Sequence, residues 1–174
     1  MSISTSSVQE AQMATANLER LLKSTAPPEE RDEILELAVQ ICAEGDRLLF
    51  GYGTRSSPEM AFKKFLEAAN PPFDFAPAQN SLGFMYERGI GCEMNISHAI
   101  HWYQLAAAQK YADAINNLGM LYESGTGPVK DYEIAAQFYL EAAEMNHLDA
   151  MNNLGYCYQH GKGTKQDYAE AARW

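Results

Sequence analysis

The strongest constraint on the fold of this chain is a motif that recurs three times at a fixed spacing of 36 residues. Residues 114–127 read AINNLGMLYESGTG, and the same Ala, Leu, Gly, Tyr and two later Gly positions return at 78–91 and 150–163. A fixed period of roughly 20 to 50 residues is typical of proteins built from stacked supersecondary units. One such unit cannot bury its apolar face alone, so neighbouring units must pack on one another. The period therefore predicts a solenoid.

Each repeat predicts two helices joined by a glycine-containing loop. The Ala, Leu and Tyr of the motif stand four residues apart, which places them on one face of a helix. We expect this first helix (helix A) at about 77–88, 112–124 and 148–160, and the second (helix B) at about 96–109, 132–145 and 168–174. The Gly after the Leu lets another helix approach, and the G-x-G loop supplies the positive φ angles that end helix A. The predicted fold is all-α, an α/α superhelical solenoid of 36-residue helix-turn-helix repeats.

A polar residue precedes each expected helix B. These residues are Ser57, Asn95, Asp131 and Asp167. Such side chains accept a hydrogen bond from the backbone at a helix start, and each contributes about 1 kcal/mol relative to Ala. We therefore expect all four to be N-caps.

The repeats also predict the organisation of the whole chain. Residues 1–7 are rich in Ser and Thr, and the following segment has apolar residues at helical spacing. Gly45, Gly51 and Gly53 keep the glycine pattern of a repeat that has lost its Leu-Gly pair. The expected segments are 1–7 (disordered), 8–24 (N-terminal capping helix), 29–69 (degenerate first repeat), 77–111, 112–147 and 148–174 (incomplete repeat). Because the sequence stops at Trp174 inside an expected helix B, we expect further repeats or a partner to cover this edge.

Composition excludes several classes of function. The formal net charge is −10, so the chain lacks the basic surface that nucleic acid or an anionic membrane requires. No apolar run is long enough to insert into a membrane, and the first residues have no features of a secretory signal. The three cysteines have no paired spacing, which favours a reducing compartment. These features predict a cytoplasmic protein.

The pattern A-x-x-x-L-G-x-x-Y-x-x-G-x-G, followed after seven residues by A-x-x-[WF]-[YF], resembles the Sel-one-like repeat, a relative of the tetratricopeptide repeat. The resemblance is strong over residues 77–174 and weak over 38–69. It implies an adaptor or scaffold for other proteins, or a regulatory subunit that activates a membrane-bound enzyme, as in fungal chitin synthase activation. A secreted bacterial branch carries a cysteine pair in each repeat. This chain has alanines near those positions, which leaves a hydrolase of that branch as a distant alternative.

A ladder of polar and apolar residues on helix A is the candidate partner site. Asn80, Asn116 and Asn152 recur in register, as do Phe84, Met120 and Tyr156, and then Glu87, Glu123 and Gln159. Amides can bond the backbone of an extended peptide while the large apolar residues contact its side chains. The alternative is that the asparagines bond a neighbouring helix and the apolar residues pack between repeats.

No set of residues predicts catalysis, a cofactor or a metal site. His98 and His101, and also Cys157 and His160, supply only two ligands each. The G-x-G segments follow a helix instead of a strand, and they recur in every repeat, so loop geometry explains them. The sequence therefore predicts a non-catalytic adaptor that binds a protein or peptide on its helix A surface.

Overall fold

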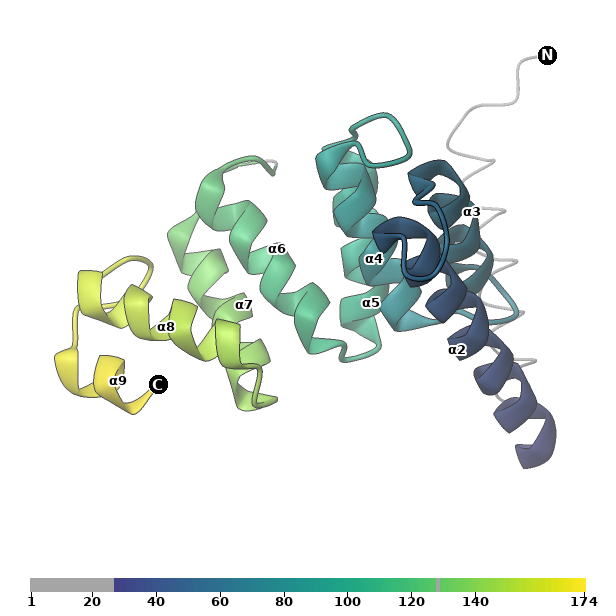
Figure 1. Ribbon diagram of the computed structural model, residues 1–174. Helices are drawn as coiled ribbons and strands as arrows, with labels where there is room; N and C mark the ends of the chain where they lie inside the picture. The colour runs from purple at the N-terminus through teal and green to yellow at the C-terminus, as the bar shows by residue number, and fades with distance from the viewer. Residues whose placement is uncertain (1–26, 128) are drawn as a thin grey trace, which may run out of the picture. The chain divides into compact units, whose positions relative to one another are not determined.

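The computed structural model describes residues 27–127 and 129–174, and every regular element within them is an α-helix (Figure 1). The helices are α2 (Pro28–Phe50), α3 (Pro58–Ala69), α4 (Ala76–Arg88), α5 (Ile96–Ala108), α6 (Ala112–Ser124), α7 (Tyr132–Glu144), α8 (Leu148–His160) and α9 (Tyr168–Arg173). The prediction of an all-α solenoid of repeats is confirmed. The predicted disordered segment 1–7 and capping helix 8–24 lie outside the described residues.

The chain divides into two compact units, one ending at Ala78 and one running from Gln79 to Trp174. In the first unit, α2 packs against α3. The ring of Phe65 is fully buried and lies against Gly45, where a Cβ atom would come within 2.8 Å of the ring. Gly45 therefore permits the close approach of these two helices. The left-handed Gly51 ends α2, as its φ of 75° and its backbone hydrogen bond to Arg47 O show.

In the second unit, helices A (α4, α6 and α8) alternate with helices B (α5, α7 and α9). Tyr103 of α5 and Tyr139 of α7 have no exposed surface. Each ring fills the space left by the helix A glycine of its own repeat, Gly83 or Gly119. The expected role of this glycine, to allow a close helix approach, is confirmed in these two repeats.

All four predicted residues stand at the N-cap positions, and three of them cap with their side chains. The side chains of Asn95, Asp131 and Asp167 accept hydrogen bonds from backbone N–H groups in the first turns of α5, α7 and α9. Ser57 is the N-cap of α3, but its side chain makes no such bond. Ser57 instead donates its backbone N–H to Leu48 O at 2.8 Å, and Pro58 starts α3 with the fixed φ that suits this position.

One loop glycine also departs from the prediction. Gly89, Gly125 and Gly161 end the three helices A in the left-handed conformation, with φ between 65° and 77°. Gly127 is outside that region. Its neighbour in the sequence is a proline, and a residue before proline is restricted to extended backbone.

None of the helices described is both long and apolar enough to cross a membrane.

Candidate functional site

The asparagines on helix A connect neighbouring repeats. Asn117 Nδ2 donates to Asn80 Oδ1 at 3.0 Å, and Asn153 Nδ2 donates to Asn116 Oδ1 at the same distance. These bonds join α4 to α6 and α6 to α8. Asn116 is only 5% exposed, and its Nδ2 also lies 3.6 Å from Met120 Sδ. The alternative expectation, that asparagines bond a neighbouring helix, is therefore confirmed for these two bonds.

The third asparagine of the predicted site differs from the other two. Asn152 of α8 is exposed. The bonding partners Asn117 and Asn153 were missing from the predicted site, although their position also recurs at 36 residues and holds Ser81 in the earlier copy. The period identifies such positions, but it does not tell which of two adjacent amides faces the next helix.

The two glutamates of the predicted site hold buried tyrosines. Tyr103 Oη donates to Glu87 Oε2 at 2.9 Å, and Tyr139 Oη donates to Glu123 Oε2 at 2.7 Å. Burial raises the pKa of both tyrosines above the usual tyrosine range, and the neighbouring carboxylate raises it further. Each glutamate thereby fixes helix B against helix A. The equivalent Gln159 is exposed.

The three apolar residues of the predicted site form a repeated exposed feature. Phe84 is 38% exposed, Met120 47% and Tyr156 43%, and they occupy the same position of α4, α6 and α8. We call these three residues the apolar stripe. A large apolar side chain is thus partly exposed at the same position of three successive repeats.

Cations accompany both aromatic residues of the apolar stripe. The Arg88 guanidinium lies 5.1 Å from the centre of the Phe84 ring. Lys162 Nζ lies 4.7 Å from the centre of the Tyr156 ring and donates to Tyr156 Oη at 3.2 Å. Mainly because of that hydrogen bond, the pKa of Lys162 is raised, and the Lys162 ammonium stays charged at neutral pH.

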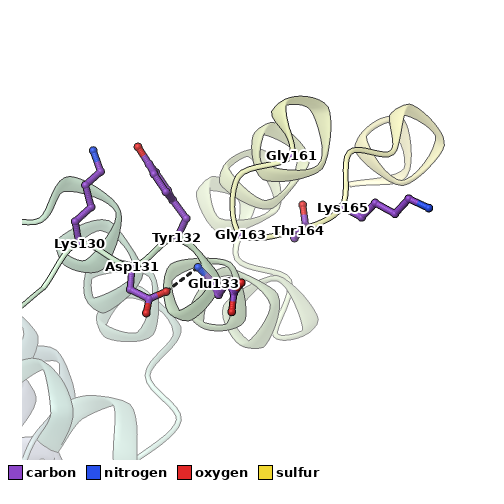
Figure 2. A pocket seen from close by; sticks show the side chains of 8 residues that line it. All are labelled: Lys130, Asp131, Tyr132, Glu133, Gly161, Gly163, Thr164 and Lys165. Carbon is purple, nitrogen blue, oxygen red and sulfur yellow. Dashed lines mark hydrogen bonds between the residues drawn. The ribbon is translucent and has the colours of Figure 1, made fainter.

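An open hollow lies between the start of α7 and the loop from α8 to α9 (Figure 2). Its lining residues are Lys130, Asp131, Tyr132, Glu133, Gly161, Gly163, Thr164 and Lys165. Lys130 and Lys165 extend to opposite sides of the hollow in Figure 2. The Asp131 carboxylate is already used as the cap of α7, at 2.9 Å and 3.0 Å from two backbone nitrogens. The lining combines two lysines and two carboxylates with the Tyr132 ring and the Thr164 hydroxyl.

Of the residues considered as ligands, His98 and His101 make ring contacts and Cys157 is buried, as is the further cysteine Cys42. The His98 ring stacks on Tyr86, with ring centres 5.0 Å apart, and His101 meets Trp102 edge-on. Burial raises the pKa of Cys42 to about 12 and that of Cys157 to about 11, which keeps both thiols protonated and unreactive at neutral pH. Within 27–127 and 129–174, no three His, Cys, Asp or Glu residues are grouped to hold a metal ion.

Comparison with known proteins agrees with this architecture. The sequence model of the Sel1 repeat family matches residues 76–111, 112–147 and 148–174, which is more than half of the chain. Over 97 residues the chain is 37% identical to chitin synthase regulatory factor 3 of Schizosaccharomyces pombe, a match that covers 55% of this chain and 10% of that protein. A Sel1-like repeat-containing protein of Acanthamoeba polyphaga mimivirus is 59% identical over 32 residues, or 18% of this chain and 6% of that protein.

Two solved structures have the same fold. One is a protective antigen of uropathogenic Escherichia coli strains with an SLR fold, at a TM-score of 0.72 and 30% identity, covering 79% of this chain and 29% of the antigen. The other is a Sel1 repeat protein from Oxalobacter formigenes. Its TM-score is also 0.72 and its sequence identity 30%, and the match covers 94% of this chain and 64% of that protein. The chain thus spans only a tenth or less of the two curated relatives and under two thirds of both structures.

Proposed function

Because the chain belongs to the Sel1 repeat family, we propose that it is a non-catalytic scaffold that holds a segment of a partner protein on its helix A surface. The observation that carries this proposal is the apolar stripe, Phe84, Met120 and Tyr156. Fully burying one such side chain contributes roughly 1.5 to 3 kcal/mol. The three are 38%, 47% and 43% exposed, so covering them together contributes less than half of the full sum, roughly 2 to 4 kcal/mol, and other contacts of the segment must add to it.

The polar residues behind the stripe support the proposal because they hold it rigid. The bonds Asn117–Asn80 and Asn153–Asn116 join successive helices A, and the two Tyr–Glu bonds join α4 to α5 and α6 to α7. A surface that is already ordered loses little conformational entropy when a partner binds. In this proposal Asn80, Asn116, Glu87 and Glu123 support the surface, and Asn152 and Gln159 remain available to a partner.

The spacing of the stripe limits the form of the partner segment. Directly packed helices lie about 8 to 10 Å apart, and an extended chain advances about 3.3 Å per residue. Successive helices A are joined by Asn–Asn bonds and packed through the intervening helix B, so one repeat corresponds to at least about three residues of an extended segment. A segment that contacts all three stripe residues needs side chains at roughly that spacing or wider.

A regulatory role toward a membrane-bound enzyme is a second candidate. The similarity to chitin synthase regulatory factor 3 of S. pombe supports it. In this version the partner segment belongs to the enzyme or to its recruiting protein, and the chain acts from the cytoplasm. Chitin synthase activity in S. pombe membranes, measured in cells that lack the factor and express this chain, tests it: restored activity supports the role, and unchanged activity argues against it.

The main proposal is tested by affinity capture from source-cell lysate with two matched baits. One carries Phe84→Ala, Met120→Ala and Tyr156→Ala. The control carries Met94→Ala, Leu140→Ala and Leu148→Ala, three exposed apolar residues of the same unit that lie outside the stripe. Circular dichroism verifies that both remain helical. The proposal expects partners that the stripe variant loses and the control keeps. Equal capture by both baits would contradict it.

A further inference from the structure

We propose that the partner segment carries acidic side chains beside the residue that contacts Tyr156, and that Lys130 and Lys162 bind them. This inference rests on the proposed function and adds the chemistry and direction of the segment. It concerns four residues, Lys130, Tyr132, Tyr156 and Lys162, which we call the lysine–tyrosine cluster.

The cluster holds two ammonium groups in place against aromatic rings. Lys130 Nζ lies 4.9 Å and Lys162 Nζ 5.2 Å from the centre of the Tyr132 ring. Lys162 is also 4.7 Å from the Tyr156 ring and hydrogen-bonded to its hydroxyl. Figure 2 shows that Lys130 and Tyr132 extend in the same direction from the start of α7. Lys162 in particular has contacts with two rings from two helices, so its charge is positioned before any ligand arrives.

Three carboxylates lie near the cluster; Glu133 lines the same hollow without an ion pair to either lysine, and the other two are already bonded to other donors. Asp131 accepts from the backbone of Glu133 and Ile134, and Glu123 accepts from Tyr139 Oη. The Glu123 carboxylate attracts the Lys162 ammonium electrostatically, without a hydrogen bond between them. In the part of the chain that the structure describes, neither Lys130 nor Lys162 forms an ion pair. An acidic side chain from a partner would form the ion pair that neither ammonium group has within the described residues.

The cluster occurs at one end of the apolar stripe only. Lys162 is the middle residue of its G-x-G loop, where the two preceding repeats have Ile90 and Thr126. The position of Lys130 is Met94 one repeat earlier. At the Phe84 end, the Arg88 guanidinium lies against the ring. Because the whole chain has a net charge of −10, a local pair of unneutralised lysines favours an acidic group at the Tyr156 end over the other end.

A randomised nonapeptide phage library, selected against the whole chain, tests this inference without knowledge of the natural partner. Selected peptides are then synthesised with a fluorophore, and their affinities are measured by fluorescence anisotropy. The variant is Lys130→Gln with Lys162→Gln. The matched control, Lys63→Gln with Lys110→Gln, changes the net charge equally at two lysines outside the cluster. Replacing Glu and Asp of the peptide by Gln and Asn provides the reciprocal test.

We expect selected peptides to combine apolar residues at about every third position or at wider spacing with acidic residues at one end. The cluster variant should bind them about tenfold more weakly, the control should bind within about twofold of wild type, and salt should weaken only wild-type and control binding. Peptides that need Phe84, Met120 and Tyr156 but show no acidic preference and bind the cluster variant equally would overturn this inference and leave the proposed function intact. Peptides that bind the triple stripe variant as well as wild type would overturn both.

Discussion

The close approach of helices A and B at Gly119 leads to the most demanding stability prediction. A Cβ atom at this position would lie 2.7 Å and 2.8 Å from two atoms of the Tyr139 ring, well inside the roughly 3.5 to 4.0 Å of an ordinary carbon contact. The ring has no exposed surface, and its hydroxyl is bonded to Glu123 at 2.7 Å. The ring therefore cannot move aside without losing packing or this bond.

Three effects decide the sign of Gly119→Ala. Alanine is favoured over glycine inside a helix by about 1 kcal/mol. Overpacking a filled interior costs about 1 to 3 kcal/mol, and straining the Tyr139–Glu123 bond costs about 1 kcal/mol more. We expect Gly119→Ala to lower the free energy of unfolding by about 1 to 3 kcal/mol.

Gly155→Ala is the matched control at the same position of the next repeat. Its Cβ atom would meet Ala171 O at 3.3 Å, the distance at which Gly119 meets Ala135 O, but no aromatic ring. We expect a change of less than about 1 kcal/mol in either direction, because the gain in helix propensity offsets the single tight contact. Urea unfolding followed by circular dichroism measures both, with the slope used to test for two-state behaviour. A Gly119→Ala protein as stable as wild type would refute the packing argument.

Three further predictions concern the polar contacts of the repeats. Glu123→Ala should cost about 1 to 3 kcal/mol of unfolding free energy because the buried Tyr139 hydroxyl loses its acceptor, whereas Glu123→Gln keeps an acceptor and should cost less; equal urea midpoints for the two would contradict this role. Asp131→Ala should cost about 1 kcal/mol and Ser57→Ala close to nothing, since only Asp131 caps its helix with its side chain; a larger effect at Ser57 would count against the observed caps. Burial raises the pKa of Tyr139 above the unfolded value of about 10, so the folded chain holds this proton more tightly and the unfolding free energy should fall as pH rises above about 10. The fall should be shallower in Tyr139→Phe, and identical pH profiles would exclude this linkage.

Much of the helical framework could be predicted because the period and the helix signals agree. The expected bounds 112–124 and 148–160 coincide with α6 and α8, and Asn95, Asp131 and Asp167 cap as their residue types predict. The two complete helices B end within one residue of the expected bounds, but the conformation of the residues that follow them was not anticipated. Lys110 and Asn146 adopt positive φ there, which satisfies the last carbonyls of α5 and α7 through backbone hydrogen bonds. Asn tolerates this conformation and offers a signal in the sequence, but Lys110 offers none.

The sequence did not predict which residues of the candidate site form hydrogen bonds to neighbouring helices. The 36-residue period placed Asn80, Phe84 and Glu87 on one helix, but it carries no distances between helices. The distance between α6 and α8 decides whether the Asn116 side chain is free to contact a peptide or is bonded to Asn153. The same limit applies to His147, which caps α8 through Nδ1 and contacts Asp113 through Nε2 at 2.8 Å, across 34 residues of sequence. Such contacts follow from the packing of successive repeats, which a linear pattern does not encode.

The affinity of the captured partner for purified wild type, the triple stripe variant and the exposed-surface control decides whether the apolar stripe is the binding surface. If the apolar stripe holds the partner segment, Phe84→Ala, Met120→Ala and Tyr156→Ala together should weaken binding by at least about tenfold, while Met94→Ala, Leu140→Ala and Leu148→Ala should change it by less than about twofold. Equal affinities for wild type and the stripe variant, with both proteins folded, would show that the partner binds elsewhere and would contradict the account.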